Sequence, residues 1–167
     1  MSFLDNLLNR NPTREWRAQP GLQLVLDLDD ESFCGIRLGE RADRLNKLGP
    51  AEDAAAARRG SYWYGSRGFL CREEQGRFVE LEAVYSGGEG QPFAGLVRRN
   101  GATATLAPQT TEPDLVAHLG KPDERKASEA EEGISSGASL TWHLNRTDCV
   151  AEFVDQQLDQ LWLGTKQ

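Results

Sequence analysis

The chain has 167 residues and a formal net charge of −7, a length that fits one domain or two small ones. Its acidic residues are spread along the sequence without any stripe of Lys and Arg, which argues against nucleic acid as a partner. The three cysteines lie in apolar runs, so we expect free, buried thiols in a reducing cytoplasm. Because neither a signal peptide nor a long apolar run is found, we expect a cytoplasmic protein without a membrane span.

Residues 1–20 stand apart from the rest of the chain. Their apolar stripe consists of Phe3, Leu4, Leu7 and Leu8 and ends before Pro12. This spacing predicts a short helix that packs on the body of the protein. The alternative is that these residues bind to a membrane surface. The stripe is short and has few basic neighbours, which argues against this alternative.

Residues 21–86 contain, in order, the patterns of a hairpin, a short helix and three strands. The apolar runs Leu24–Leu26 and Phe33–Leu38 flank an acidic turn and predict the hairpin. The helix is predicted over Glu40–Leu48, and Gly49 with Pro50 would end it. After a polar stretch, we expect strands at 61–64, 68–72 and 77–85.

Residues 92–164 show the same order, after a glycine-rich linker at 87–91. The runs 93–97 and 102–106 predict a hairpin around the Asn100-Gly101 turn. Glu112–Leu119 predicts a helix that ends at Gly120. A polar stretch at 123–137 is expected to form a loop, and strands are expected at 139–142, 149–154 and 158–163.

The recurrence of this order predicts the fold class. Leu48-Gly49-Pro50 returns as Leu119-Gly120-Lys121-Pro122, and an apolar hairpin precedes each copy. Internal repetition indicates a fold built from two copies of one unit. We therefore expect an α+β fold with two tandem repeats, each a hairpin, a helix ending in Leu-Gly-x-Pro and a three-strand antiparallel run. The two repeats are expected to share one compact core, because about seventy residues make a poor core alone.

This order of elements between residues 21 and 164 resembles the β-lactamase-inhibitor-protein-like fold. It is also similar to the single-copy module of outer-membrane assembly lipoproteins of the SmpA/OmlA kind. The resemblance implies a binding module whose concave sheet grips another protein, and it carries over no catalytic residue. The chain lacks a secretion signal and the paired disulfides of the secreted inhibitors, which argues against inhibition of a β-lactamase.

No residue pattern indicates catalysis or metal binding. The two histidines, His118 and His143, belong to no motif, and we expect them at the surface or at the edge of the core. The acidic run Asp27–Glu31 lacks the spacing of a calcium loop, so we interpret it as a solvated turn. The sequence therefore predicts no catalytic residue, no metal site, no cofactor and no enzymatic activity.

Aromatic and acidic residues alternate along the predicted strands. Neighbouring side chains of a strand point to opposite faces, so we expect an apolar row with Val79 and a mixed row with Phe78 and Leu158. Aromatic rings supply buried area and carboxylates bind basic groups, which suits a protein partner. The predicted partner-binding residues are Tyr62, Trp63, Tyr64, Phe78, Glu80, Glu82, Trp142 and Trp162. The alternative is that a helix or the N-terminal segment covers this face.

These observations predict a non-enzymatic bacterial protein-binding module, such as an immunity or inhibitor protein that neutralises or escorts a basic partner. Acidic charge would speed the capture of such a partner and make binding sensitive to salt. One alternative is a structural homodimer that buries the same face against itself. Another is a small hydrolase that uses carboxylates such as Glu80 and Glu82.

Overall fold

The structure is a computed structural model that describes residues 11–87, 90–128 and 137–166. In these ranges the chain is mostly β, with twelve strands in two sheets. The apolar stripe expected at Phe3 to Leu8 lies outside the described residues.

The larger sheet has seven strands, and all of its neighbouring strands are antiparallel. Its strands lie in the order β4 (Ser61–Tyr64), β5 (Phe69–Glu74), β6 (Arg77–Val84), β12 (Gln157–Thr165), β11 (Thr147–Val154), β10 (Gly137–His143) and β9 (Glu124–Ser128). The sheet is continuous across the two halves of the chain because β6 pairs with β12. Strand β9 falls where the sequence predicts a loop.

The smaller sheet has five short strands and also combines both halves of the chain. Its order is β3 (Ile36–Arg37), β2 (Ser32–Phe33), β1 (Val25–Asp27), β7 (Leu96–Arg99) and β8 (Ala102–Thr105). The pairing of β1 with β7 is parallel, and it places Leu26 beside Val97 in the core.

Helical structure is limited to four short segments in the described residues. These are the 3-10 helices η1 (Ala42–Leu48) and η2 (Gly65–Arg67) and the α-helices α2 (Ala54–Ala57) and α3 (Glu112–Leu119). A capping box starts α3, since the Thr111 side chain accepts from the Asp114 amide and the Asp114 carboxylate accepts from the Thr111 amide. Leu45, Leu48, Leu115 and Leu119 are buried and anchor η1 and α3 on the core.

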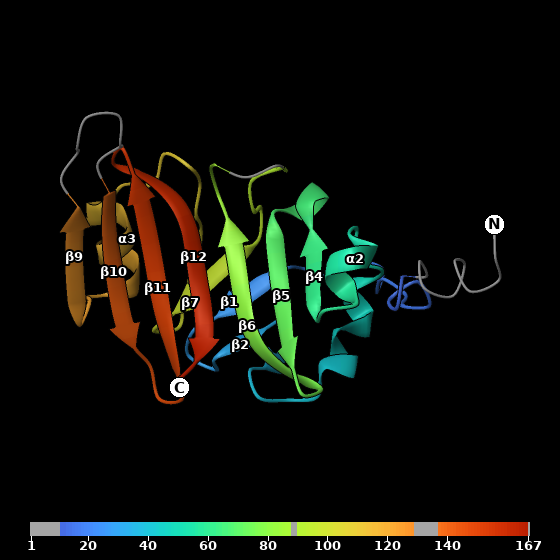
Figure 1. Cartoon of the computed structure of the whole chain (residues 1–167). Coiled ribbons are helices and arrows are strands. Elements are labelled where there is room, and N and C mark those ends of the chain that lie inside the picture. The colour runs from blue at the N-terminus through green and yellow to red at the C-terminus, as the bar shows by residue number, and fades with distance from the viewer. Residues whose placement is uncertain (1–10, 88–89, 129–136, 167) are drawn as a thin grey trace.

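The core lies between one face of the seven-stranded sheet and a layer formed by the smaller sheet and the helices. Figure 1 views the molecule from the other face of the large sheet, with α3 behind β9 to β11 and with β1, β2 and β7 behind its centre. Aromatic rings fill the middle of the core; Phe33 and Phe69, for example, meet edge to face with centroids 5.0 Å apart. One face of the large sheet is therefore covered, and no described element covers the other.

The predicted α+β class with two tandem helix-plus-sheet repeats is wrong. The molecule is dominated by its five-stranded and seven-stranded sheets, and the expected helix at 40–48 is the 3-10 helix η1. The two hairpins do not form separate units, because β1 and β7 join them into one sheet. Gly49 and Gly120 follow the helices with positive φ, but their ψ values of −177° and 179° are not those of left-handed caps.

Candidate functional site

The candidate site is the uncovered face of the seven-stranded sheet, which we call the open face. Strand alternation and pairing place one row of side chains across its centre. From β4 through β10 this row consists of Trp63, Leu70, Glu82, Trp162, Val150 and Thr141. All six side chains are partly exposed, so the row combines two indoles, two aliphatic groups, a carboxylate and a hydroxyl at the surface.

Both tryptophans of the open face lie flat on the sheet because a glycine two residues later leaves room for them. A Cβ atom on Gly164 would lie 2.1 Å from Cζ2 of Trp162. A Cβ atom on Gly65 would lie 2.7 Å from Nε1 of Trp63. Gly164 shares a face of β12 with Trp162, since residues i and i+2 of a strand lie on the same side. Gly65 starts η2 directly after β4, and there too the indole covers bare backbone. The rings are thus held in place, with one side directed away from the sheet.

A hollow of about 420 Å³ lies beside Trp162 at the β5–β6 turn end of the open face. It is lined by Glu74, Val79, Glu80, Asp148, Trp162 and Thr165. Three of these six residues carry carboxylates. Arg72 pairs with Glu80 at 3.2 Å, and His143 lies 2.9 Å from Asp148 through Nδ1. The hollow therefore joins an aromatic wall to an acidic lining.

Glu82 lies next to Trp162 across the β6–β12 pair and next to Leu70 across the β5–β6 pair. Burial among these apolar neighbours raises the pKa of its carboxyl group, and the charge of Glu80 raises this pKa further. The Arg72 guanidinium acts in the opposite direction. A half-buried carboxylate without a hydrogen-bonding partner among the described residues is suited to receive a cationic group from outside.

His143 stands at the edge of this acidic region. Its Nδ1 faces Asp148 at 2.9 Å and its Nε2 faces Glu124 at 3.4 Å. The hydrogen bond with Asp148 is the main cause that raises the pKa of His143, and Glu124 adds to the effect. The imidazole is 44% exposed, so it is an edge residue of the open face, in line with the sequence-based expectation.

Four of the eight predicted partner-binding residues lie on the open face, and four lie on the covered face. Trp63, Glu80, Glu82 and Trp162 form the first group. The second group is Tyr62, Tyr64, Phe78 and Trp142, whose exposed fractions are 6% or less. We therefore assign the second group to the core instead of a partner interface.

Hydrogen bonds to the neighbouring layer explain why Tyr64 and Trp142 point inward, and contacts with Glu73 and Trp16 hold Tyr62. The Tyr64 hydroxyl donates to the carbonyl of Gly49 at 2.9 Å, and Nε1 of Trp142 donates to the carbonyl of Gly120 at 3.0 Å. Each aromatic residue thus satisfies a backbone carbonyl at the end of η1 or α3. Tyr62 donates to the Glu73 carboxylate and contacts the ring of Trp16.

β-bulges explain the incorrect side-chain orientation at Phe78 and Leu158. The register between β5 and β6 shifts after Arg72, and Val79 is the extra residue. Phe78 therefore points into the core and Val79 into the open-face hollow. A second shift in the β11–β12 pair makes Asp159 the extra residue and turns Leu158 inward. One added residue reverses every earlier alternation in the strand.

Sequence reasoning missed Asp148 as a residue of the site. The strand predicted from the sequence begins at Cys149 and excludes Asp148, whereas β11 begins at Thr147. Alternation gives the signal that could have found it. Asp148, Val150 and Glu152 follow a period of two and oppose the buried Cys149 and Ala151.

No protein-family profile matches this chain, and no curated protein matches it. One solved structure with similarity is the crystal structure of a DUF4309 family protein (YjgB) from Bacillus subtilis subsp. subtilis str. 168. It is 14% identical in sequence, the match covers 97% of each chain, and the TM-score is 0.44. None of these comparisons bears on the resemblance to the β-lactamase-inhibitor-protein-like fold, which stays a prediction. Among the described residues, no helix has the length and apolar content needed to cross a membrane.

Proposed function

We propose that this protein is a non-enzymatic binding module that captures a basic segment of another protein on its open face, in the manner of an immunity, inhibitor or escort protein. The observation that carries the proposal is the placement of Trp162, flat on Gly164 and beside an acidic hollow. An ordered indole next to carboxylates provides both a packing surface and a counter-charge for Arg or Lys.

Charge favours a basic partner over a second copy of this chain. The hollow contains Glu74, Glu80 and Asp148, and Glu82 lies in the adjoining row. Two such faces pressed together would bring like charges into contact, which opposes association. A basic partner would instead relieve the repulsion between Glu80 and Glu82.

The shape of the site favours binding over hydrolysis. Glu80 and Glu82 lie on the outer surface of a sheet, and Glu80 is paired with Arg72. Hydrolytic carboxylates act in a site that holds the substrate and controls water. The open face offers a broad surface, which is typical of protein recognition.

The proposal is tested by affinity capture, followed by binding measurements with the purified partner and with an octa-arginine peptide. Trp162→Ala is expected to weaken binding by about 2 kcal/mol, roughly 30-fold, as for a central aromatic contact. Glu80→Gln is expected to weaken binding and to reduce its dependence on salt. Asp155→Asn is the matched control, because it removes one negative charge at the exposed β11–β12 turn.

Binding that is unchanged by Trp162→Ala, or an equal affinity for octa-glutamate, would contradict the proposal. Sedimentation of the free protein tests the homodimer alternative. A stable dimer that Trp162→Ala dissociates would replace capture of a basic partner with self-association.

A further inference from the structure

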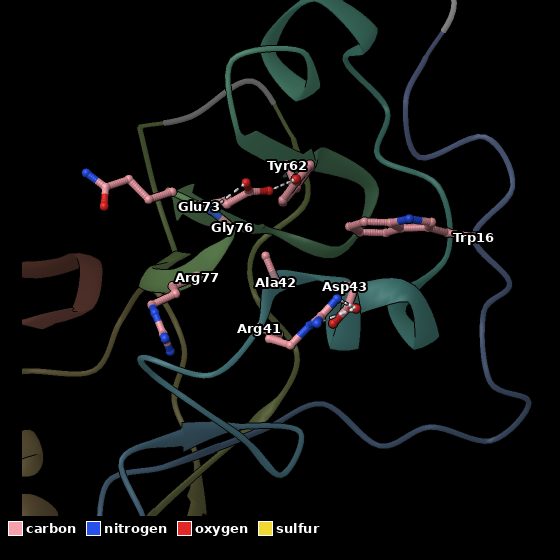
Figure 2. Close-up of a pocket in the computed structure, with 9 residues that line it drawn as sticks. Trp16, Arg41, Ala42, Asp43, Tyr62, Glu73, Gly76 and Arg77 are labelled. Carbon is pink, nitrogen blue, oxygen red and sulfur yellow. Dashed lines mark hydrogen bonds and ion pairs between the residues drawn. The ribbon is translucent and has the colours of Figure 1, made fainter.

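A second hollow, of about 540 Å³, lies apart from the open face and shares no lining residue with the hollow beside Trp162. It is open to solvent on one side and is lined by Trp16 of the N-terminal segment, by the start of η1, by β4 and by the β5–β6 turn (Figure 2). Its volume falls within the range of roughly 300–1,000 Å³ that is typical of small-molecule sites.

Two aromatic rings form one wall of this hollow. The rings of Trp16 and Tyr62 have centroids 5.0 Å apart, with 53° between their planes. Trp16 is held by a local turn, since its amide donates to the carbonyl of Thr13 at 2.9 Å. The buried Thr13 hydroxyl in turn accepts from the amide of Ala51 at 2.8 Å. The indole therefore has a fixed support and remains partly exposed toward the hollow.

Four charged groups of the hollow make contacts with one another or with nearby polar groups, and the Gln75 amide is exposed. Glu73 accepts from the Tyr62 hydroxyl and, at 3.1 Å, from the Gly76 amide. Arg41 holds Asp43 through Nε at 3.1 Å and through Nη2 at 2.7 Å. Arg77 donates to the carbonyl of Gly39 at 2.7 Å. Figure 2 shows Glu73, Arg41 and Asp43 around the same space as the indole, and the Arg77 side chain extends away from it.

The charges of these groups cancel, and this balance limits the class of ligand. Arg41 and Arg77 oppose a cation, although an aromatic wall with carboxylates would otherwise suit one. Asp43 and Glu73 oppose an anion. A neutral ligand meets neither repulsion. Carboxylates, guanidinium groups and the Gln75 amide supply both acceptors and donors, which is the complement that hydroxyl groups require.

We propose that this hollow binds a neutral, hydroxyl-rich ring, such as one pyranose unit of a glycan. The apolar C–H face of the ring would pack on Trp16, and its hydroxyl groups would bond to Asp43, Glu73 and Gln75. This site is independent of the protein-binding role proposed for the open face.

The test is an NMR titration of the full chain with methyl β-D-glucopyranoside and with N-acetylglucosamine, using choline and glucuronate as charged comparison ligands. The neutral sugars are expected to bind in the millimolar range and to shift the Trp16 indole and Gly76 amide signals. Trp16→Ala should weaken this binding at least about tenfold, a loss of about 1.4 kcal/mol. Trp162→Ala, on the open face, should leave it unchanged.

Asp43→Asn tests the charge argument without disturbing the core, because the Asp43 side chain is 61% exposed. This variant leaves Arg41 unpaired, so glucuronate should gain affinity while the neutral sugars lose it. The proposal is overturned if neither sugar shifts these signals at high millimolar concentration, or if choline or glucuronate binds the unmodified protein more tightly than both. Sugar binding that survives Trp16→Ala in a folded variant would also overturn it.

Discussion

At Glu82, burial and like charge act in the same direction. The carboxyl group is placed between Leu70 and Trp162, and Glu80 lies two residues away on the same strand and face. Both effects favour the protonated form and raise the pKa of Glu82 in the folded protein. An unfolded chain relieves both effects, so the ionised carboxylate destabilises the fold.

Glu82→Gln should therefore stabilise the protein at neutral pH. Because the folded pKa is raised, the destabilisation is absent below the ordinary value of 4.5 and develops as pH rises through the folded pKa. The gain in the free energy of unfolding should be no more than about 1 kcal/mol, since the group is partly solvated. It should shrink toward zero at pH 4. Urea unfolding at pH 7 and pH 4 measures both values.

Asp155→Asn, at an exposed turn, is the control for a general change in net charge. A gain for Glu82→Gln that is equal at both pH values would contradict the linkage argument. If the open face captures a basic partner, Glu82→Gln should also weaken that binding, because the removed charge faces the partner. A stabilising change that weakens binding is the usual mark of a residue kept for function.

At the scale of the element, Gly164 in β12 and Gly65 at the start of η2 determine how the open-face indoles lie. Gly164 has no positive φ, so alanine is compatible with its backbone. The cost of a side chain comes from the Trp162 ring that covers it. The orientation of the Trp162 ring therefore depends on both Trp162 and Gly164.

Gly164→Ala should displace the Trp162 indole with little effect on stability. Replacing glycine in a strand gains about 0.5–1 kcal/mol of backbone entropy, and the lost packing of the indole offsets a gain of that size. The near-ultraviolet circular dichroism and the Trp162 fluorescence should change, and binding to the open face should weaken about tenfold. The same substitution in a Trp162→Ala background should leave binding unaffected. If Gly164→Ala weakens binding equally in the two backgrounds, Gly164 does not act through Trp162, and the argument is contradicted.

Strand positions could be predicted from the sequence, but the face of each side chain could not always be. Alternation placed β4, β6 and β12 within a few residues of their observed ends. It failed at Phe78 and Leu158 because each of these strands contains a β-bulge. A bulge depends on how the strand pairs with its neighbour, so the sequence of one strand does not reveal it. The sequence gives no sign that Tyr64 and Trp142 point inward, because their acceptors, Gly49 and Gly120, are 15 and 22 residues away.

At the scale of the whole molecule, the acidic run Asp27–Glu31 joins the two halves of the chain. Asp29 accepts from the amides of Asn100 and Gly101 at 2.8 and 2.9 Å. Glu31 is buried and accepts from the Arg146 amide at 2.7 Å and from the Thr147 hydroxyl at 2.8 Å. The interpretation of this run as a solvated turn is therefore wrong for Glu31. Its partners are 115 and 116 residues away, which no local pattern indicates.

The interleaved sheets predict that the chain folds as one cooperative unit. The smaller sheet needs the parallel pair of β1 with β7, and the larger sheet needs the pair of β6 with β12. Separation into fragments 1–87 and 90–167 would break the β1–β7 pair, the β6–β12 pair and the contacts of Glu31 with Arg146 and Thr147. Each fragment would also expose a long strand, β6 or β12, as an unpaired edge, which promotes aggregation.

We expect the full chain to unfold in a single transition, with coincident loss of β-structure and of tryptophan fluorescence. Each fragment alone should show neither a cooperative transition nor protected amides in β6 or β12. Mixing the fragments during refolding should restore protection in both strands, because the missing pairs are then supplied in trans. Hydrogen exchange of the full chain, the separate fragments and the mixture measures this directly. A fragment that folds alone with protected strands would show that its half has a self-sufficient core, against the shared core that the sheet pairing requires.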